Sequence, residues 1–154
     1  MLGTTAIGPL SGLFAGDFLR TGGYIEIPSS LRGTVDTAAN VHYQNAETDL
    51  RRTLQDRGAA FLRGYFLNEA RGNGTPLQTN GTRLWRYNGG LDWTTESSGA
   101  FTTRLFGSQE HYRQTFSAIA ADRDSEFLTR VQQVATQQMG GSIQWTKILR
   151  PWLL

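Results

Sequence analysis

The sequence predicts an all-β protein, an antiparallel up-and-down meander of about six long strands. The chain has 154 residues, a length that suits one domain, and it contains 18 glycines, 18 threonines and 10 glutamines. Glycine and threonine are poor helix formers, and threonine suits the polar face of a strand. Two further observations favour strands. Apolar and polar residues alternate over long stretches, and tight turns that end in glycine separate some of these stretches.

Six segments are the expected strands. The first, at 10–24, is interrupted by glycines and gives the weakest pattern, and the second, at 41–54, is more polar. In the third, at 59–70, apolar residues such as Leu62 alternate with polar ones such as Arg63. The other three span 82–95, 100–112 and 131–146. We expect lengths of about 10 to 15 residues, whereas strands of soluble proteins average about 5 to 6.

The clearest alternation, at 82–95, fixes which side chains share a face. One face carries Trp85, Tyr87, Leu91 and Trp93, and the other carries Arg86, Asn88 and Asp92. The first face should also collect apolar residues of the next two strands: Phe101, Leu105, Met139, Ile143 and Trp145. The second face should collect their polar neighbours: Arg104, Gln138, Ser142 and Gln144. A register error of one residue would invert the whole assignment.

The connections between these strands are expected to differ in length. Gln55–Gly58 and Glu96–Gly99 are four-residue turns of the kind that a hairpin requires. Long polar loops are expected at about 25–40, 71–81 and 114–129. Short and long connections therefore alternate, which in a meander gathers the turns at one end and the loops at the other.

This pattern is typical of the wall of a transmembrane β-barrel, and we expect an open segment of such a barrel. Barrel strands are apolar on the lipid face and polar on the lumen face, with aromatic residues at both membrane interfaces. Trp85 and Trp93 are eight residues apart on one face, which is about 26 Å along a strand and close to the apolar band of about 25 Å. A soluble β-sandwich or meander with one solvated face remains the alternative, because it alternates in the same way.

Composition excludes several other classes of protein. No apolar run approaches the ~18 residues of a membrane-spanning helix, and the absence of cysteine excludes disulfides and cysteine-based zinc sites. The net charge is only +2, so no nucleic-acid partner is expected. Arg51, Arg52 and Arg57 are better explained as charges at a membrane interface.

Part of the chain resembles the middle barrel strands of bacterial TonB-dependent outer-membrane receptors. The resemblance covers roughly residues 10–147, and the segments that carry it are 61–66, 68–80, 85–93, 111–117 and Asp122-Arg123. It implies that 1–154 is a partial receptor barrel domain in the bacterial outer membrane, one that takes up a scarce ligand such as a ferric siderophore. Members of the family have a plug domain and a TonB-binding box before a 22-stranded barrel. Neither is visible here, and the alternation stops at 148–154, so we expect a fragment.

No enzymatic chemistry is expected from the motifs. His42 and His111 stand in no metal-ligand spacing, and the sequence contains no nucleophile motif such as Gly-x-Ser-x-Gly. The segment 122–126 places three carboxylates at alternate positions but lacks the glycine and distal glutamate of a calcium loop. A solvated loop with an Asp-Arg pairing explains it better. The sequence therefore predicts neither a cofactor nor a metal site.

The candidate binding residues are polar side chains in the expected long loops. They are Arg71, Asn73, Gln78, Asn80 and Arg83 in one loop, and His111, Tyr112 and Arg113 leading into the next. Arginine and tyrosine suit an anionic chelate. The expected partners are the lipid bilayer, a small chelate ligand, and the TonB complex, which would be reached only through the missing plug. The alternative function is that of a soluble secreted β-sheet module that binds glycans through exposed Trp and Tyr.

Overall fold

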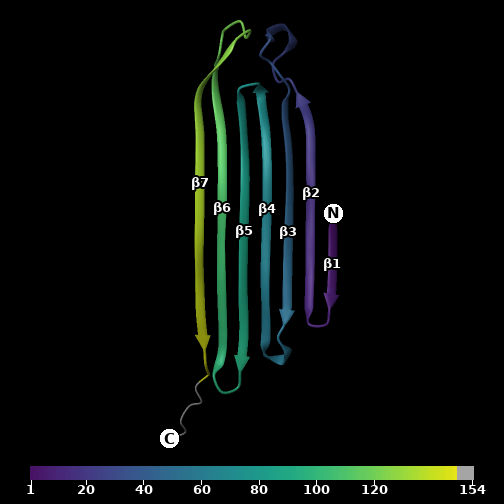
Figure 1. Ribbon diagram of the computed structural model, residues 1–154, viewed down its shortest axis with the longest axis vertical. Helices are drawn as coiled ribbons and strands as arrows, with labels where there is room; N and C mark the ends of the chain where they lie inside the picture. Colours follow the sequence, from purple (N-terminus) through teal and green to yellow (C-terminus); the bar gives the residue numbers. More distant parts are fainter. Residues whose placement is uncertain (149–154) are drawn as a thin grey trace.

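The protein is a single antiparallel sheet in which each strand pairs with the next in the chain (Figure 1). The structure, a computed structural model, describes residues 1–148, so most of the expected irregular tail at 148–154 lies outside the described residues. The strands are β1 (Leu2–Ile7), β2 (Leu10–Tyr24), β3 (Ala39–Thr53), β4 (Gly58–Thr75), β5 (Gln78–Thr95), β6 (Gly99–Ile119) and β7 (Glu126–Thr146). The predicted all-β meander is confirmed. The described sheet is not closed into a barrel.

The structure has one strand more than the sequence predicted. The additional strand β1 is only six residues long, too short to show a clear alternation, and it pairs with Leu10–Ala15 of β2. The upper half of β2 therefore has β3 as its only neighbour in the described sheet. On the opposite side, the 21-residue strand β7 pairs with β6 and has no second partner among residues 1–148. The sheet thus has two edges.

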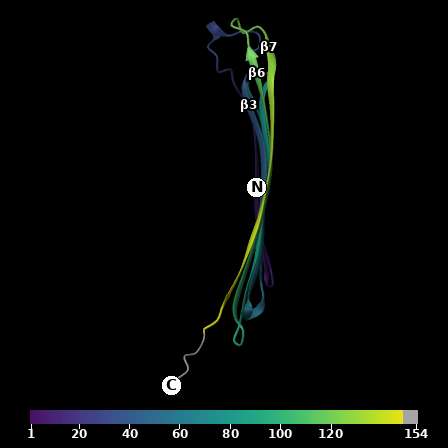
Figure 2. The same ribbon diagram turned by 90° about the vertical axis from the view of Figure 1, so that its left-hand side faces the viewer.

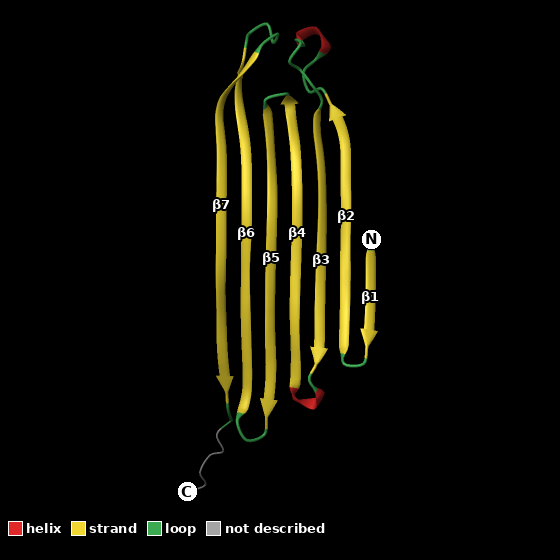
Figure 3. Ribbon diagram, in the orientation of Figure 1, coloured by secondary structure: helices red, strands yellow, loops and turns green. Residues whose placement is uncertain are grey.

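Two of the three expected long loops are wrong. Strands β4 and β5 continue through 71–81 and meet in a turn of two residues, Pro76 and Leu77. The expected loop at 114–129 shrinks to 120–125, because β6 and β7 extend into it. The segment 71–81 is polar on both faces of the sheet, and polarity alone does not distinguish such a strand from a loop. Only the connection at 25–38 is long, and it contains a single 3-10 turn at Ser29–Leu31 (Figure 3).

The tight turns at the opposite end are confirmed. A 3-10 turn at Gln55–Arg57 connects β3 to β4, and Glu96–Ser98 connects β5 to β6. We call this the turn end of the sheet, and the end that carries the connections 25–38, 76–77 and 120–125 the loop end. Gly99 closes the β5–β6 turn with a φ of +89°, in the left-handed region that favours glycine.

Gly99→Ala should therefore destabilise the protein by about 1 to 3 kcal/mol. A Cβ atom at Gly99 would collide with the carbonyl oxygen of Thr146, in addition to the strained φ. The matched control is Gly3→Ala, because a Cβ atom there meets nothing within 4 Å. Urea unfolding of the two variants measures the difference, and equal midpoints would contradict the expected strain at Gly99.

The register divides the side chains into two faces as the sequence predicted. Paired residues of neighbouring strands point to the same side, and Trp93 pairs with Phe101, which pairs with Trp145. The aromatic face, defined by Trp85 and Trp93, also carries the predicted residues Tyr87, Leu91, Leu105, Met139 and Ile143. The polar face, defined by Arg86 and Asp92, carries the predicted residues Asn88, Arg104, Gln138, Ser142 and Gln144.

Residues 1–148 form one bowed layer, and no second layer packs on it within this part of the chain (Figure 2). Among residues 1–148, Leu84 is the only hydrophobic residue that is buried. Large apolar side chains of the aromatic face are exposed instead, with Trp85 50% and Met139 82% accessible. An exposed apolar surface of this kind indicates contact with another apolar phase or surface. No helix within 1–148 has the length and apolar character needed to cross a membrane.

Candidate functional site at the loop end of the sheet

At the loop end, the 25–38 segment crosses above the shorter β4–β5 hairpin and meets the β6–β7 connection (Figure 1). The backbone amide of Thr37 donates to the carbonyl of Gly74, at the hairpin tip, over 2.9 Å. Further along, the amide of Val35 donates to the carbonyl of Arg123 over 3.1 Å. The amide of Thr34 donates to Oδ1 of Asp124 over 2.9 Å. All three connections of this end are thereby joined.

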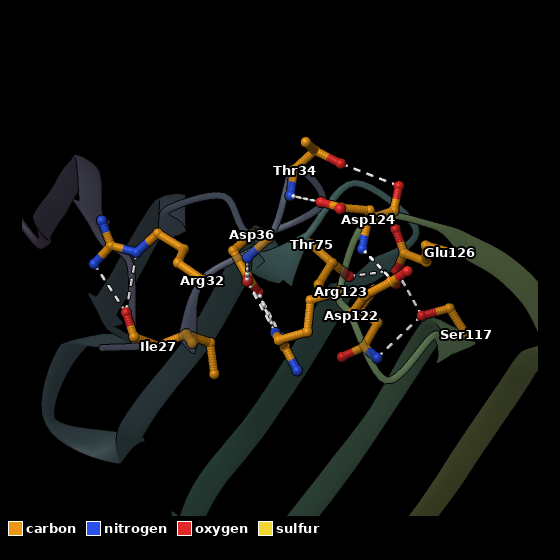
Figure 4. Close-up of polar contacts among 12 residues, drawn as sticks. Ile27, Arg32, Thr34, Asp36, Thr75, Ser117, Asp122, Arg123, Asp124 and Glu126 are labelled. Atoms are coloured by element: carbon orange, nitrogen blue, oxygen red, sulfur yellow. Dashed lines mark hydrogen bonds and ion pairs between the residues drawn. The ribbon is translucent and has the colours of Figure 1, made fainter. Parts of the chain in front are cut away.

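The centre of this junction is an ion pair between Asp36 and Arg123 (Figure 4). Arg123 donates from Nε to both carboxylate oxygens, over 3.0 and 2.9 Å, and from Nη2 to Oδ1 over 2.5 Å. The Asp36 side chain has no accessible surface. The expected solvated loop with an Asp-Arg pairing agrees with the structure, and the partner of Arg123 belongs to a different connection, 87 positions away.

The environment of Asp36 favours its charged form. The hydrogen bond from Arg123 lowers the pKa of the carboxyl group from 3.8 to about 2, against the opposing effect of burial, and the amide of Gly33 contributes a bond of 2.8 Å. A side chain at Gly33 would collide with the backbone of Arg123, so the close approach of the two segments requires glycine at this position. We call the contacts of Gly33, Thr34, Asp36, Arg123 and Asp124 the loop clamp.

Glu126 makes a second junction at the first residue of β7. Its carboxylate accepts hydrogen bonds from the hydroxyl groups of Thr75 and Ser117, the latter over 2.5 Å, and from the amide of Leu77 over 3.1 Å. Burial tends to raise the pKa of Glu126, but these hydrogen bonds outweigh it and lower the pKa below its usual value. The tip of the β4–β5 hairpin is thus tied to β6 and β7 (Figure 4).

The eight predicted binding residues all lie in strands rather than in loops. Arg71 and Asn73 belong to β4, Gln78, Asn80 and Arg83 to β5, and His111, Tyr112 and Arg113 to β6. They lie toward the loop end, as expected, but they divide between the two faces. Arg83 is directly opposite His111 on the aromatic face, which also carries Arg113. Arg71, Asn80 and Tyr112 lie on the polar face.

On the polar side, these candidates form local pairs rather than one pocket. Arg71 forms a salt bridge with Glu69 over 2.8 Å, and Tyr112 donates to Oε1 of Gln114 over 2.8 Å. Asn73 donates to the side chain of Asn80 over 3.0 Å. Gln78 donates to the hydroxyl of Ser117 over 3.0 Å. The structure therefore brings together Asn73 with Asn80 and Arg83 with His111, and it does not assemble all eight.

The polar face contains an open hollow of about 690 Å³ midway along the strands. Its lining includes charged and amide side chains from five strands: Glu47, Arg63, Asn88, Glu110 and Gln138. Ion pairs on this face join Arg63 to Asp49 and Arg104 to Asp92, each over 2.7 Å. Such a surface can bind water and polar solutes. Within 1–148, no cluster of three or more His, Asp or Glu side chains could hold a metal ion.

The residues of the loop clamp were not among the sequence-derived candidates. Gly33, Thr34 and Asp36 belong to a segment without any periodic pattern, so no signal marked them. The acidic run Asp122–Glu126 is visible in the sequence, but its partners lie in distant segments that no local pattern indicates. No protein family, curated protein or solved structure matches the chain.

Proposed function

We propose that this sheet is part of the wall of a transmembrane β-barrel in the bacterial outer membrane, in a transporter of the TonB-dependent receptor type. The observation that carries the proposal is the arrangement of the aromatic face. Phe66 and Trp85 lie in one cross-strand row, with ring centroids 4.4 Å apart. Trp93, Phe101 and Trp145 lie in another row near the turn end. Between them the face is mainly apolar: Phe14, Leu50, Leu62, Tyr87, Leu91, Leu105, Met139 and Ile143.

This apolar band has the height of a membrane. Eight residues separate the two aromatic rows on β5, which corresponds to about 26 Å along the strand, and barrels carry an apolar band of about 25 Å between two aromatic girdles. The same residues would be costly to expose to water over so large a surface. Contact with lipid acyl chains would account for both the height of this band and its apolar character.

The polar face suits a water-filled lumen. Its charges are of both signs and partly paired with one another, and the hollow at its centre is open to solvent. In a soluble β-sandwich the apolar face would pack against a second layer, whereas residues 1–148 form a single layer whose apolar face is exposed. The loop end, with its joined connections, would then face the outside of the cell, where barrels carry their longer loops.

The transport activity is proposed from the resemblance of 61–66, 68–80, 85–93, 111–117 and Asp122-Arg123 to barrel strands of TonB-dependent receptors. A receptor of this type captures a scarce ligand, such as a ferric siderophore, and its uptake is energised through a plug domain and the TonB complex. On the polar face, Arg71, Asn80 and Tyr112 lie where such a ligand would pass at the outer mouth of the lumen. Arginine offers the paired donors that an anionic chelate requires.

The test uses the absence of native cysteine, which allows single-cysteine variants to be spin-labelled without background. Positions 138–145 of β7 are labelled one at a time in protein refolded with phosphatidylcholine vesicles. The labels at 139, 141, 143 and 145, on the aromatic face, should be accessible to oxygen, which dissolves in lipid. The labels at 138, 140, 142 and 144 should be accessible to a water-soluble nickel complex instead.

A period of two in these accessibilities would support a membrane wall. If every label were equally accessible to the nickel complex, and the protein were monodisperse without detergent, a soluble sheet would be the correct interpretation and glycan binding through the exposed Trp and Tyr would become the leading function. Ligand capture is tested separately, by measuring the affinity of a ferric siderophore for the refolded protein and for its Arg71→Gln variant. Equal affinities would argue against a role for Arg71.

A further inference from the structure

Above the apolar band, the aromatic face becomes basic. Two rows of paired residues cross the sheet between Trp85 and the loop end. They contain five exposed basic side chains, which belong to β2, β3, β5 and β6. We call them the basic patch: Arg20, His42, Arg83, His111 and Arg113. Arg20 is directly opposite His42, and Arg83 is directly opposite His111.

The patch has no acidic counterpart on its own face. In the regularly paired part of the sheet, all six carboxylates point to the polar face: Asp17, Glu47, Asp49, Glu69, Asp92 and Glu110. Arginines on that face, such as Arg63, Arg71 and Arg104, form salt bridges with them. No salt bridge within 1–148 involves Arg20, Arg83 or Arg113. The two faces of the sheet therefore differ in charge: the polar face carries both arginines and carboxylates, and the aromatic face carries the basic patch without carboxylates in the regularly paired strands.

Two residues of the patch, His42 and Arg113, also line a hollow of about 530 Å³. Small residues in the middle strands, Ala70, Gly72 and Gly81, form its floor, with His42 on one side and Arg113 on the other. A Cβ atom at Gly72 would come within 2.8 Å of the side chain of Asn40, so the small residue keeps this space open. The result is a depression flanked by cationic and hydrogen-bonding groups.

We propose that the basic patch binds the phosphate group of a lipid headgroup in the monolayer that surrounds the barrel on its loop side. The inference rests on the proposed membrane location. The two rows lie two and four residues beyond Trp85, which is about 7 and 13 Å along the strand, and a bilayer's headgroup layer begins where its hydrocarbon core ends. A phosphate at this depth meets the patch while its acyl chains lie along the apolar band below.

The chemistry of the patch favours a phosphate over a neutral headgroup. Guanidinium groups bind phosphate oxygens in bidentate fashion, and each basic residue near an anionic membrane surface contributes about 1 kcal/mol, or about fivefold in affinity. Arg83 and Arg113 are diagonal neighbours on adjacent strands, a spacing of about 7 to 8 Å that long side chains can bridge around one phosphate. Arg52, an arginine of β3 on the aromatic face, lies near the turn end and is not part of this arrangement.

The test measures quenching of tryptophan fluorescence by brominated lipids, because Trp85 lies directly below the patch. The full chain is refolded in vesicles of phosphatidylcholine mixed with phosphatidic acid, with bromine on the chains of one lipid or the other. Brominated phosphatidic acid should quench more strongly than brominated phosphatidylcholine at equal content. In Arg83→Gln/Arg113→Gln this preference should fall by at least about fivefold.

Three controls locate the site. Arg51→Gln/Arg86→Gln removes the same charge from the polar face and should keep the preference of the unmodified protein. Ala70→Leu fills the hollow without a change in charge and should lower the preference, and an unchanged preference would overturn the location in the hollow. Displacement of phosphatidic acid by an equal concentration of inorganic phosphate would overturn the assignment to a lipid headgroup.

The same measurement separates the two proposals. Quenching by brominated phosphatidylcholine in every variant, with no preference for phosphatidic acid, would overturn the headgroup site and leave the membrane wall intact. Absence of quenching by either lipid would overturn the membrane location and the headgroup site together. A preference that is equal in the unmodified protein and in Arg83→Gln/Arg113→Gln would show that the basic patch does not carry it.

Discussion

Leu105→Arg is expected to lower the free energy of unfolding in lipid by about 2 to 4 kcal/mol. Leu105 lies midway between the two aromatic rows of the aromatic face, and its side chain is 63% accessible. In a bilayer this position corresponds to the midplane, where an arginine side chain cannot reach water on either side without deforming the membrane. The measurement is a urea titration of the protein refolded in phosphatidylcholine vesicles.

Asn88→Arg is the matched control, because Asn88 pairs with Phe106, one residue from Leu105, and points to the polar face. At nearly the same depth, the new charge would enter a wet lumen, so the cost should be about 1 kcal/mol or less. Equal costs for the two variants would contradict the membrane location, and a larger cost for Asn88→Arg would mean that the polar face is the one in contact with lipid.

Asp36→Asn is expected to release the 25–38 segment from the loop end. The substitution removes the charge that Arg123 binds through three hydrogen bonds, and it leaves a guanidinium group without its partner inside the clamp. Trypsin cleavage after Arg32, within this segment, should accelerate by at least about tenfold, because proteolysis follows the population of the open segment. Glu26→Gln is the control, since Glu26 is exposed in the same segment and carries the same charge. Similar cleavage rates in the two variants would contradict the clamp.

The clamp should also resist acid to an unusual degree. The pKa of Asp36 is lowered from 3.8 to about 2, so its contribution is fully present above 3.8 and is lost as the pH falls through about 2. Pepsin, which is active in this range, provides the measurement. The rate of cleavage of Asp36→Asn, divided by that of the unmodified protein, should be large at pH values just above 3.8. This ratio should approach one as the pH falls through about 2, where Asp36 becomes protonated. A ratio that is independent of pH would contradict the shifted pKa.

The fold was predictable wherever one face of the sheet is apolar. The alternation around Trp85 and Arg86 fixed the faces of three strands, and glycines at 58 and 99 marked two turns. At the loop end both faces are polar, so the period of two disappears and β4 and β5 could not be followed to Pro76. A strand of six residues such as β1 is too short for an alternation of apolar and polar residues to be recognised in the sequence.

The candidate site was less predictable than the fold. The sequence predicts the binding residues in loops, but they lie in strands, and Arg83 and Tyr112 point to opposite faces because their strands extend further than expected. The pairing of Asp36 with Arg123 depends on how one connection crosses above the β4–β5 hairpin. That path follows from the lengths of β4 and β5, which local sequence did not reveal.

The outer edge of β7 has a consequence for assembly. Along this strand of 21 residues, the amide and carbonyl groups that point away from β6 have no strand partner in the described sheet. Hydrocarbon offers no substitute for water as a hydrogen-bonding partner, and each unpaired group costs several kcal/mol there. We therefore expect entry into the bilayer to occur only together with the pairing of this edge. If that partner strand belongs to another polypeptide, the rate of insertion depends on protein concentration.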